Sequence, residues 1–292
     1  MSVINTNVNS LVAQTAVNVN ARNLSRAMEQ LSTGKRINGA KDDAAGLSIA
    51  QVMTSQIRGL NQAIRNANDG ISLLQTADGG MIEQSNMLQR MRELAVQAAS
   101  DTVTESQKSY LDNEFQALKT EIDRIGANTS WNDRKLLNGG GGLAGNVDDA
   151  GAGKYMFQVG SSSTTIEVIV PNARTDSGTD TDVSDPLYEG IVDSNLLDAE
   201  SADAAIGELD DALEAANSAR SKIGAAINQL TYAADNMSNI AMNTAASRSR
   251  IEDTDYASAS AELARTQIIQ QAATAMLAQA NQSPQSVLAL LK

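Results

Sequence analysis

The sequence predicts a mainly α-helical protein, an elongated antiparallel helical bundle or coiled coil with a small β-hairpin. Apolar or small residues between positions 206 and 251 recur at alternating steps of three and four, with no proline between them. This spacing is typical of a helix that packs along its whole length against other helices. At about 1.5 Å per residue such a helix is roughly 70 Å long. Aromatic residues make up only 3% of the 292 residues, which suits thin helical seams better than a thick globular core.

Composition excludes several classes of function. The chain contains no cysteine and no histidine, so we expect no disulfide, no thiolate or histidine metal site, no His-dependent nucleophile and no cofactor. We therefore predict no catalytic residue and no metal ligand. No window of 18 apolar residues predicts a transmembrane helix, and residues 1–10 lack the basic flank and apolar run of a cleaved signal peptide.

The net charge of −13 is unevenly distributed along the chain. Residues 176–214 contain thirteen acidic side chains and no Lys or Arg. An acidic middle argues against nucleic acid as a partner, because phosphates would be repelled. We expect an acidic surface excursion at residues 171–195.

The two ends of the chain carry apolar helical stripes with few charges. We expect an N-terminal arm at residues 1–43, whose helix ends at Gly34. We also expect a C-terminal arm at residues 250–292, whose helix ends at Pro284. Frequent asparagine weakens the first arm as an isolated helix, so we expect it to be helical only when packed. The predicted coiled-coil residues are Ile4, Val8, Leu11, Leu24, Met28, Leu31, Leu263, Ile268, Met276, Leu277, Val287, Leu288 and Leu291.

Between the arms the sequence predicts a helical rod in two parts, residues 44–170 and 196–249. Asp42 or Asp43 caps the first rod helix, residues 78–80 (DGG) either interrupt it or are absorbed, and Thr104 with Gln107 forms a capping box. Residues 155–159 and 165–170 predict a β-hairpin. The predicted rod core consists of Ile57, Leu60, Ile64, Ile71, Leu74, Leu111, Phe115, Leu118, Ile122, Leu209, Leu213, Ile223, Ile227, Leu230 and Met237.

This order of segments is nearly palindromic: arm, rod, β insert, rod, arm. A chain reversal at the insert brings the two arms side by side. Residues 287–291 contain four large apolar side chains and no charge. Such an apolar tail is unusual on the surface of a soluble monomer, so we expect a partner surface to cover it.

Several segments resemble the sequence signatures of bacterial flagellin. In the first half these are residues 31–38 (LSTGKRIN), 40–46 (AKDDAAG), 65–71 (RNANDGI) and 89–96 (QRMRELAV). In the second half they are residues 248–256 (RSRIEDTDY), 278–282 (AQANQ) and 288–291 (LALL). The resemblance covers roughly residues 1–170 and 195–292, and the motifs together are highly specific.

The resemblance implies a structural subunit of an extracellular flagellar filament that serves swimming motility. Its arms would form an inner coiled coil, and the acidic excursion would stand in place of large outer domains. The chain would be secreted unfolded through the flagellar type III apparatus, without a cleaved signal peptide. Its partners would be further copies of itself, hook-associated junction and cap proteins and an export chaperone. By resemblance, a host Toll-like receptor would contact Arg90, Leu94, Gln97 and Glu114.

Other interpretations remain open at this point. A hook–filament junction protein shares the same arm design, and a membrane-active helical rod is disfavoured because the terminal stripes have few Lys or Arg. Arg90, Glu93 and Glu114 also fit ordinary solvated helix residues. The acidic pairs at 42–43, 148–149 and 210–211 fit helix caps and solvated faces better than acid–base chemistry. Ser and Thr at 161–165 and 175–184 fit a solvated loop better than a glycan site.

Overall fold

The computed structural model describes residues 7–139, 153–160, 164–175 and 187–290, and its contacts divide the chain into two compact units. One unit combines Met1–Ile57 with Met242–Lys292, and the other is Arg58–Ala241. Both boundaries lie closer to the middle of the chain than the predicted arm ends at residues 43 and 250. The two units are described separately below.

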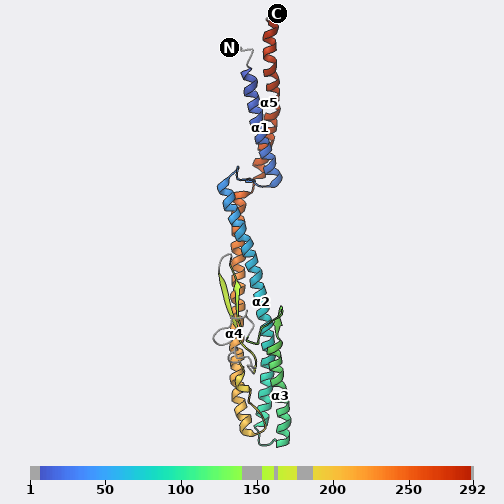
Figure 1. The fold of residues 1–292 in the computed structure, drawn as a ribbon, viewed down its shortest axis with the longest axis vertical. Helices are drawn as coiled ribbons and strands as arrows, with labels where there is room; N and C mark the ends of the chain where they lie inside the picture. Colours follow the sequence, from blue (N-terminus) through green and yellow to red (C-terminus); the bar gives the residue numbers. More distant parts are fainter. Residues whose placement is uncertain (1–6, 140–152, 161–163, 176–186, 291–292) are drawn as a thin grey trace. The chain divides into compact units, whose positions relative to one another are not determined.

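The first unit contains an antiparallel pair of helices from opposite ends of the chain, α1 (Val8–Thr33) and α5 (Tyr256–Leu290) (Figure 1). Asn7 caps α1, since its side chain accepts a hydrogen bond from Ser10 N at 3.1 Å. Gly34 ends the helix in the left-handed conformation, with φ 71°, as expected for a C-terminal glycine. The Asp255 carboxylate accepts a 2.9 Å bond from Ala257 N where α5 begins.

The prediction that Pro284 ends the last helix is wrong. α5 continues through Pro284 to Leu290. A proline removes one backbone donor from a helix, and the Ala, Gln and Leu residues on either side favour the helical backbone strongly enough to continue it.

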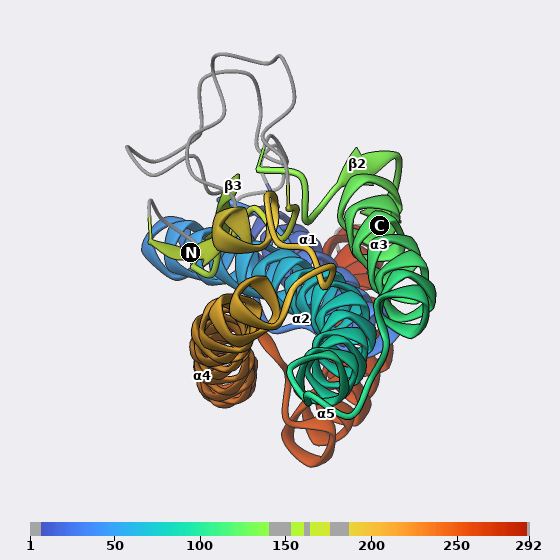
Figure 2. The same ribbon diagram turned by 90° about the horizontal axis from the view of Figure 1, so that it is seen from below.

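The second unit is built on three helices. α2 (Ala44–Ala98) begins in the first unit and continues into the second, where α3 (Glu105–Asn128) and α4 (Ala199–Glu252) flank it (Figures 1 and 2). α2 and α4 are antiparallel, because Asp78 pairs with Arg220 at 2.9 Å and Arg92 pairs with Asp210 at 2.6 Å.

The ends of these helices follow the expected capping chemistry. The carboxylate of Asp43 accepts a 2.9 Å bond from Gly46 N and caps α2. Gln107 Oε1 accepts a 3.0 Å bond from Thr104 N at the start of α3, the backward bond of a capping box. Residues 78–80 are absorbed into α2 without a break.

Two short antiparallel hairpins complete the second unit. The predicted one pairs β3 (Gly153–Gln158) with β4 (Thr165–Val170), with Tyr155 opposite Val168. It approaches α2 closely, because a Cβ built on Gly70 would lie 2.8 Å from the Phe157 ring. The other, β1 (Ser130–Trp131) with β2 (Arg134–Lys135), was not predicted, and Asn132 and Asp133 adopt positive φ in its turn. A 3₁₀ turn, η1 (Glu189–Ile191), precedes α4.

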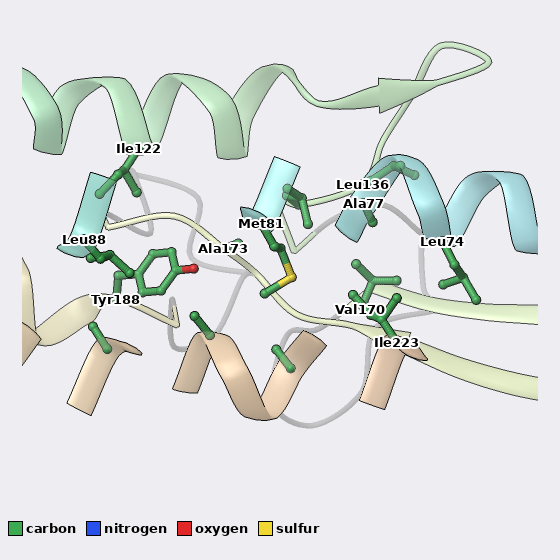
Figure 3. Close-up of a cluster of buried hydrophobic side chains, with 14 of the residues drawn as sticks. Leu74, Ala77, Met81, Leu88, Ile122, Leu136, Val170, Ala173, Tyr188 and Ile223 are labelled. Carbon is green, nitrogen blue, oxygen red and sulfur yellow. The ribbon is translucent and has the colours of Figure 1, made fainter. Parts of the chain in front are cut away.

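The core of the second unit gathers side chains from all three helices and from the chain between them (Figure 3). Leu74, Met81 and Leu88 come from α2, Ile122 from α3 and Ile223 from α4. Of the predicted rod residues, the structure buries Leu60, Leu74, Phe115, Ile122, Leu209, Ile223, Leu230 and Met237. It half-buries Ile57, Ile64, Ile71, Leu111, Leu118, Leu213 and Ile227.

The segment at residues 171–195 differs from the expected surface excursion. Its described ends enter the core, where Asn172, Ala173, Tyr188 and Ile191 are buried. The many acidic residues of this segment predicted an exposed loop, although a few of its apolar side chains pack against α2 and α3. Residues 176–186, which hold the first four acidic positions of the segment, lie outside the described residues.

A single buried amide links the parts of this core. Gln84 of α2 is 0% exposed, and its Nε2 donates to Ile122 O at 3.0 Å and to Ala173 O at 2.7 Å. The Tyr188 hydroxyl donates to Gln84 Oε1 at 3.4 Å, and burial raises the pKa of this hydroxyl. Gln84 therefore joins α2 to α3 and to both ends of the segment at residues 171–195.

Candidate functional site

The first unit has an exposed apolar groove along α1, here called the open groove. It is lined by Val8, Leu11, Val12, Thr15, Ala16, Val19, Asn20 and Asn23 of α1 and by Ile269 of α5. Val8 is 58% exposed, Leu11 56% and Val12 64%. These side chains are too apolar and too numerous for an ordinary solvated helix face.

A different face of α1 packs against α5 and is here called the seam. Between residues 256 and 282 the non-exposed positions of α5 follow strict steps of four and three: Ala259, Leu263, Thr266, Gln270, Ala273, Leu277 and Ala280. The corresponding positions of α1 are Ser10, Ala13, Val17, Asn20, Leu24, Ala27 and Leu31. This is a heptad seam made largely of small and polar residues.

Only some of the predicted coiled-coil residues lie in the seam. Leu24, Leu31, Leu263 and Leu277 are half-buried in the seam, whereas Val8, Leu11, Met28, Ile268 and Met276 are exposed. Ile4 and Leu291 lie outside the described residues, as do the side chains of Val287 and Leu288.

Sequence reasoning missed the polar members of the seam. Asn20 is buried, and its Nδ2 donates to Thr266 O at 2.8 Å and to Gln270 Oε1 at 2.9 Å. Heptad counting back from Leu24 and forward from Leu263 would have found these positions. They were overlooked because only apolar residues were counted.

Two of the sequence motifs meet where the end of α1 lies beside the start of α5, a place here called the base of the terminal pair. Lys35 Nζ bonds Glu252 at 2.6 Å, Arg36 Nη2 donates to Ile251 O at 2.7 Å, and Arg36 N donates to Glu252 O at 2.7 Å. Thr254 N donates to Gly34 O at 3.0 Å. These contacts join residues 31–38 to residues 248–256 and hold the start of α5 beside the end of α1.

A second exposed cluster lies on α2 and α3 of the second unit. Arg90 Nε and Nη2 each lie 3.0 Å from Glu114 Oε1, and Arg90 Nη1 lies 2.9 Å from Glu93 Oε2. Hydrogen bonds to Glu93 and Glu114 raise the pKa of Arg90. Gln97 is exposed on the same helix as Arg90.

Leu94 does not share this surface. It is 1% exposed and belongs to the core cluster, so a receptor contact through Leu94 is not available in this conformation. The expected set therefore reduces to Arg90, Gln97 and Glu114. The α-helical period explains the difference, because Leu94 lies three residues after Met91 on the buried face of α2.

Acid–base and metal chemistry find no support in the described part of the chain. Asp43 caps α2, and Asp210 bonds Arg92, which lowers the pKa of Asp210. No group of three or more acidic side chains is placed to hold a metal ion in the ranges that the structure describes. Nor is any of the described helices long and apolar enough to cross a membrane. Asp148 and Asp149 lie outside the described residues.

Paired terminal helices, long antiparallel helices and an uncovered apolar groove define a helical protein of the self-assembling class. The model of the bacterial flagellin N-terminal helical region matches residues 4–141, and that of the bacterial flagellin C-terminal helical region matches residues 206–291. The chain belongs to the bacterial flagellin family, whose members are structural proteins and not enzymes.

Individual relatives agree with this assignment. A flagellin from Halalkalibacterium halodurans is 42% identical over 290 residues, covering 99% of this chain and 100% of the relative. Flagellin A from Vibrio anguillarum is 34% identical over 375 residues, covering 99% of each chain. The structure of a flagellar hook-associated protein from Vibrio parahaemolyticus matches 73% of this chain and 100% of its own, with a TM-score of 0.55 and 14% identity, a likeness of fold alone. The chain is thus a structural subunit of the flagellar filament, and the predicted mainly α fold is confirmed.

Proposed function

We propose that the open groove is the surface through which this subunit is joined to further copies of itself in an extracellular filament. The observation that carries the proposal is the exposure of Val8, Leu11 and Val12 on a helix that already has a partner on another face. Burying such side chains is favourable by about 1.5–3 kcal/mol each.

The charge distribution supports burial of the same surface. Residues 7–21 contain no charged side chain, and neither do residues 266–291. Buried charges are costly unless they are paired, so an uncharged pair of helices suits a position covered by many copies. The acidic residues lie elsewhere in the chain and would keep the assembled surface soluble.

The test places a charge in the groove and observes assembly by electron microscopy. Val12→Asp combined with Ile269→Asp should abolish filaments while the second unit stays folded. Val12→Ile combined with Ile269→Leu keeps the groove apolar and should form filaments like the parent chain. Normal filaments from the aspartate variant would refute the groove as an assembly surface.

The remaining functional details follow from the family resemblance. We infer export through the flagellar type III apparatus with the help of a chaperone, contacts with hook-associated junction and cap proteins, and a role in swimming motility. A strain whose only filament subunit carries the aspartate pair should secrete the protein into the medium without swimming. Failure of the parent chain to restore swimming would contradict the motility role.

We also propose the exposed cluster of Arg90, Gln97 and Glu114 as a contact surface for a host Toll-like receptor. Its support is the side-by-side placement of Arg90 and Glu114 on two helices. Arg90→Ala should reduce activation of receptor-bearing reporter cells. Arg124→Ala, which removes another exposed arginine paired with Glu121, is the matched control and should have no effect. Equal activation by both variants would refute the assignment.

A further inference from the structure

We propose that Asn20 selects the face of α1 that packs against α5, and so keeps the more apolar face open for assembly. Asn20 is a positioning residue: by bonding α5 it determines which way the open groove faces, and it forms only the edge of that groove. That the open groove serves assembly rests on the proposed function. Which face of α1 packs against α5 is a property of the helix pair alone.

The starting point is that apolar burial alone does not choose between the two faces of α1. The seam face offers Val17, Leu24 and Leu31 as its large apolar residues. The open groove offers Val8, Leu11, Val12 and Val19, which are at least as apolar and are concentrated in the half of the helix farther from Gly34. In that half the seam has only Ser10, Ala13, Val17 and Asn20. Hydrophobic packing would therefore favour turning the Val8–Val19 face toward α5.

Polar contacts distinguish the two arrangements. Asn20 is buried and donates both amide hydrogens, one to Thr266 O at 2.8 Å and one to Gln270 Oε1 at 2.9 Å. Nearer the end of the chain, Asn7 Nδ2 donates to Ala280 O at 2.8 Å, and Ser10 Oγ donates to Asn281 Oδ1 at 2.7 Å. A polar residue at one core position of a coiled coil specifies the pairing geometry at a cost in stability.

Between residues 256 and 282, where the side chains of α5 are described, one seam position offers this partner. Its seam repeats an alanine–leucine pair, Ala259 with Leu263 and Ala273 with Leu277, and between the two pairs lie Thr266 and Gln270. With α1 rotated, the buried Asn20 would leave the seam, and its hydrogen bonds to Thr266 O and Gln270 Oε1 would be lost. A buried polar group left without its partner shifts such an equilibrium by about tenfold or more.

The contacts at the base of the pair do not replace Asn20. The bonds from Gly34 and Arg36 to residues 251–254 fix the start of α5 beside the end of α1. Asn20 lies fourteen residues before Gly34 in the sequence, about 20 Å along a helix. The face presented by residues 8–20 is therefore set by the seam contacts in that half.

The experiment uses the full chain, whose lack of cysteine leaves no background thiol. Ser10→Cys with Asn281→Cys reports the observed face, because these two side chains are bonded. Leu11→Cys with Asn281→Cys reports the rotated face. Disulfides are formed by mild oxidation of soluble chains and of filaments, and intramolecular products are identified by their monomer mass on a non-reducing gel.

In the parent background the first cysteine pair should cross-link about tenfold more than the second. Asn20→Ala removes both hydrogen bonds without adding apolar volume, and it should bring the two yields to within about threefold of each other. Asn18→Ala makes the same exchange at an exposed position outside the groove and should keep the parent ratio.

Three results would overturn the proposal: an unchanged ratio in Asn20→Ala, equal yields in the parent background, or no cross-link from either pair in Asn20→Ala. The last counts because the proposal requires α1 to keep pairing through its other face. Failure of the proposed function would appear differently, as a parent chain that forms no filaments whatever its cross-link ratio.

Discussion

Gln84 is the residue on which the second unit depends most for polar contacts. Its amide bonds Ile122 O and Ala173 O and accepts from Tyr188, so four segments of the chain share one side chain. Close backbone approach accompanies it, because a Cβ built on Gly126 would lie 2.5 Å from Ala173 O. The amide therefore fixes the chain segment that α3 and α2 enclose.

Replacing this amide should destabilise the second unit strongly. Gln84→Leu removes the hydrogen bonds that Gln84 makes to the buried Ala173 O, to the Tyr188 hydroxyl and to Ile122 O, of which Ile122 O keeps its bond within α3, and we expect a loss of about 3 kcal/mol in the free energy of unfolding. Chemical denaturation followed by circular dichroism measures it. Gln75→Leu, at an exposed position of the same helix, is the control and should change stability by less than about 0.5 kcal/mol. Equal losses in both variants would contradict the role of Gln84.

Two buried polar residues were missed by a count of apolar positions alone. Gln84 and Asn20 both lie at positions where helical spacing predicts burial, yet glutamine and asparagine are usually exposed. Their partners are mostly backbone carbonyls, which carry no sequence signal. Leu94 shows the opposite case, since a family pattern suggested a surface role and the local period places it in the core.

Within α2, two adjacent glycines have different surroundings, although the sequence marks both as potential breaks. A Cβ on Gly79 would meet nothing within 4 Å. A Cβ on Gly80 would lie 2.8 Å from Leu137 Cδ1 and 3.0 Å from Thr129 Oγ1. Gly80 therefore permits close packing of the chain that follows α3, whereas Gly79 only weakens the helix.

This difference predicts opposite effects of the same substitution. Gly79→Ala should stabilise the protein by about 0.5–1 kcal/mol, because alanine favours the helix. Gly80→Ala should destabilise it by about 1–3 kcal/mol, because Leu137 and Thr129 must move. Thermal unfolding of the two variants beside the parent chain provides the comparison. A rise in the melting temperature of Gly80→Ala equal to that of Gly79→Ala would show that packing at Gly80 does not matter.

Element boundaries were predictable where a local chemical signal exists. Asp43, Gln107 and Gly34 each mark a helix end by capping, and the alternation at residues 165–170 marks a strand. Two elements were not predicted correctly. The hairpin of β1 and β2 has strands of two residues each, too short for any periodicity, and the helix through Pro284 overrides a local breaker.

For the chain as a whole, the thin seam between α1 and α5 predicts that assembly orders the terminal helices further than their pairing alone does. Small and polar seam residues bury little apolar surface, so the pair gains less from packing than the core of the second unit does. Helix content measured by far-ultraviolet circular dichroism should rise when soluble subunits form filaments. In soluble subunits, trypsin should cut at Arg22 and Arg265 of the terminal helices before it cuts at Arg92 and Arg220, whose ion pairs join α2 to α4. Equal ellipticity in both states would contradict this expectation.

The fold class and the family were accessible from sequence because they depend on long-range regularities. The heptad spacing extends over residues 206–251, and the motifs lie in both terminal regions. The lack of cysteine and histidine is a property of the whole sequence. The division of apolar residues between seam and groove was not accessible. Val8 and Leu24 are sixteen residues apart, about 160° around an α-helix, so they lie on different faces, but only the structure shows which face packs against α5.

The bond between Asn7 and Ala280 joins residues 273 positions apart in the sequence. Contacts of such separation form late, because nearly the entire chain must be present and correctly placed before the two groups meet. A nascent or shortened chain that lacks the last helix therefore leaves α1 without its partner, however well the middle has folded. Incorporation of a subunit into the filament therefore depends on complete synthesis of α5, because α1 cannot pair before α5 is present.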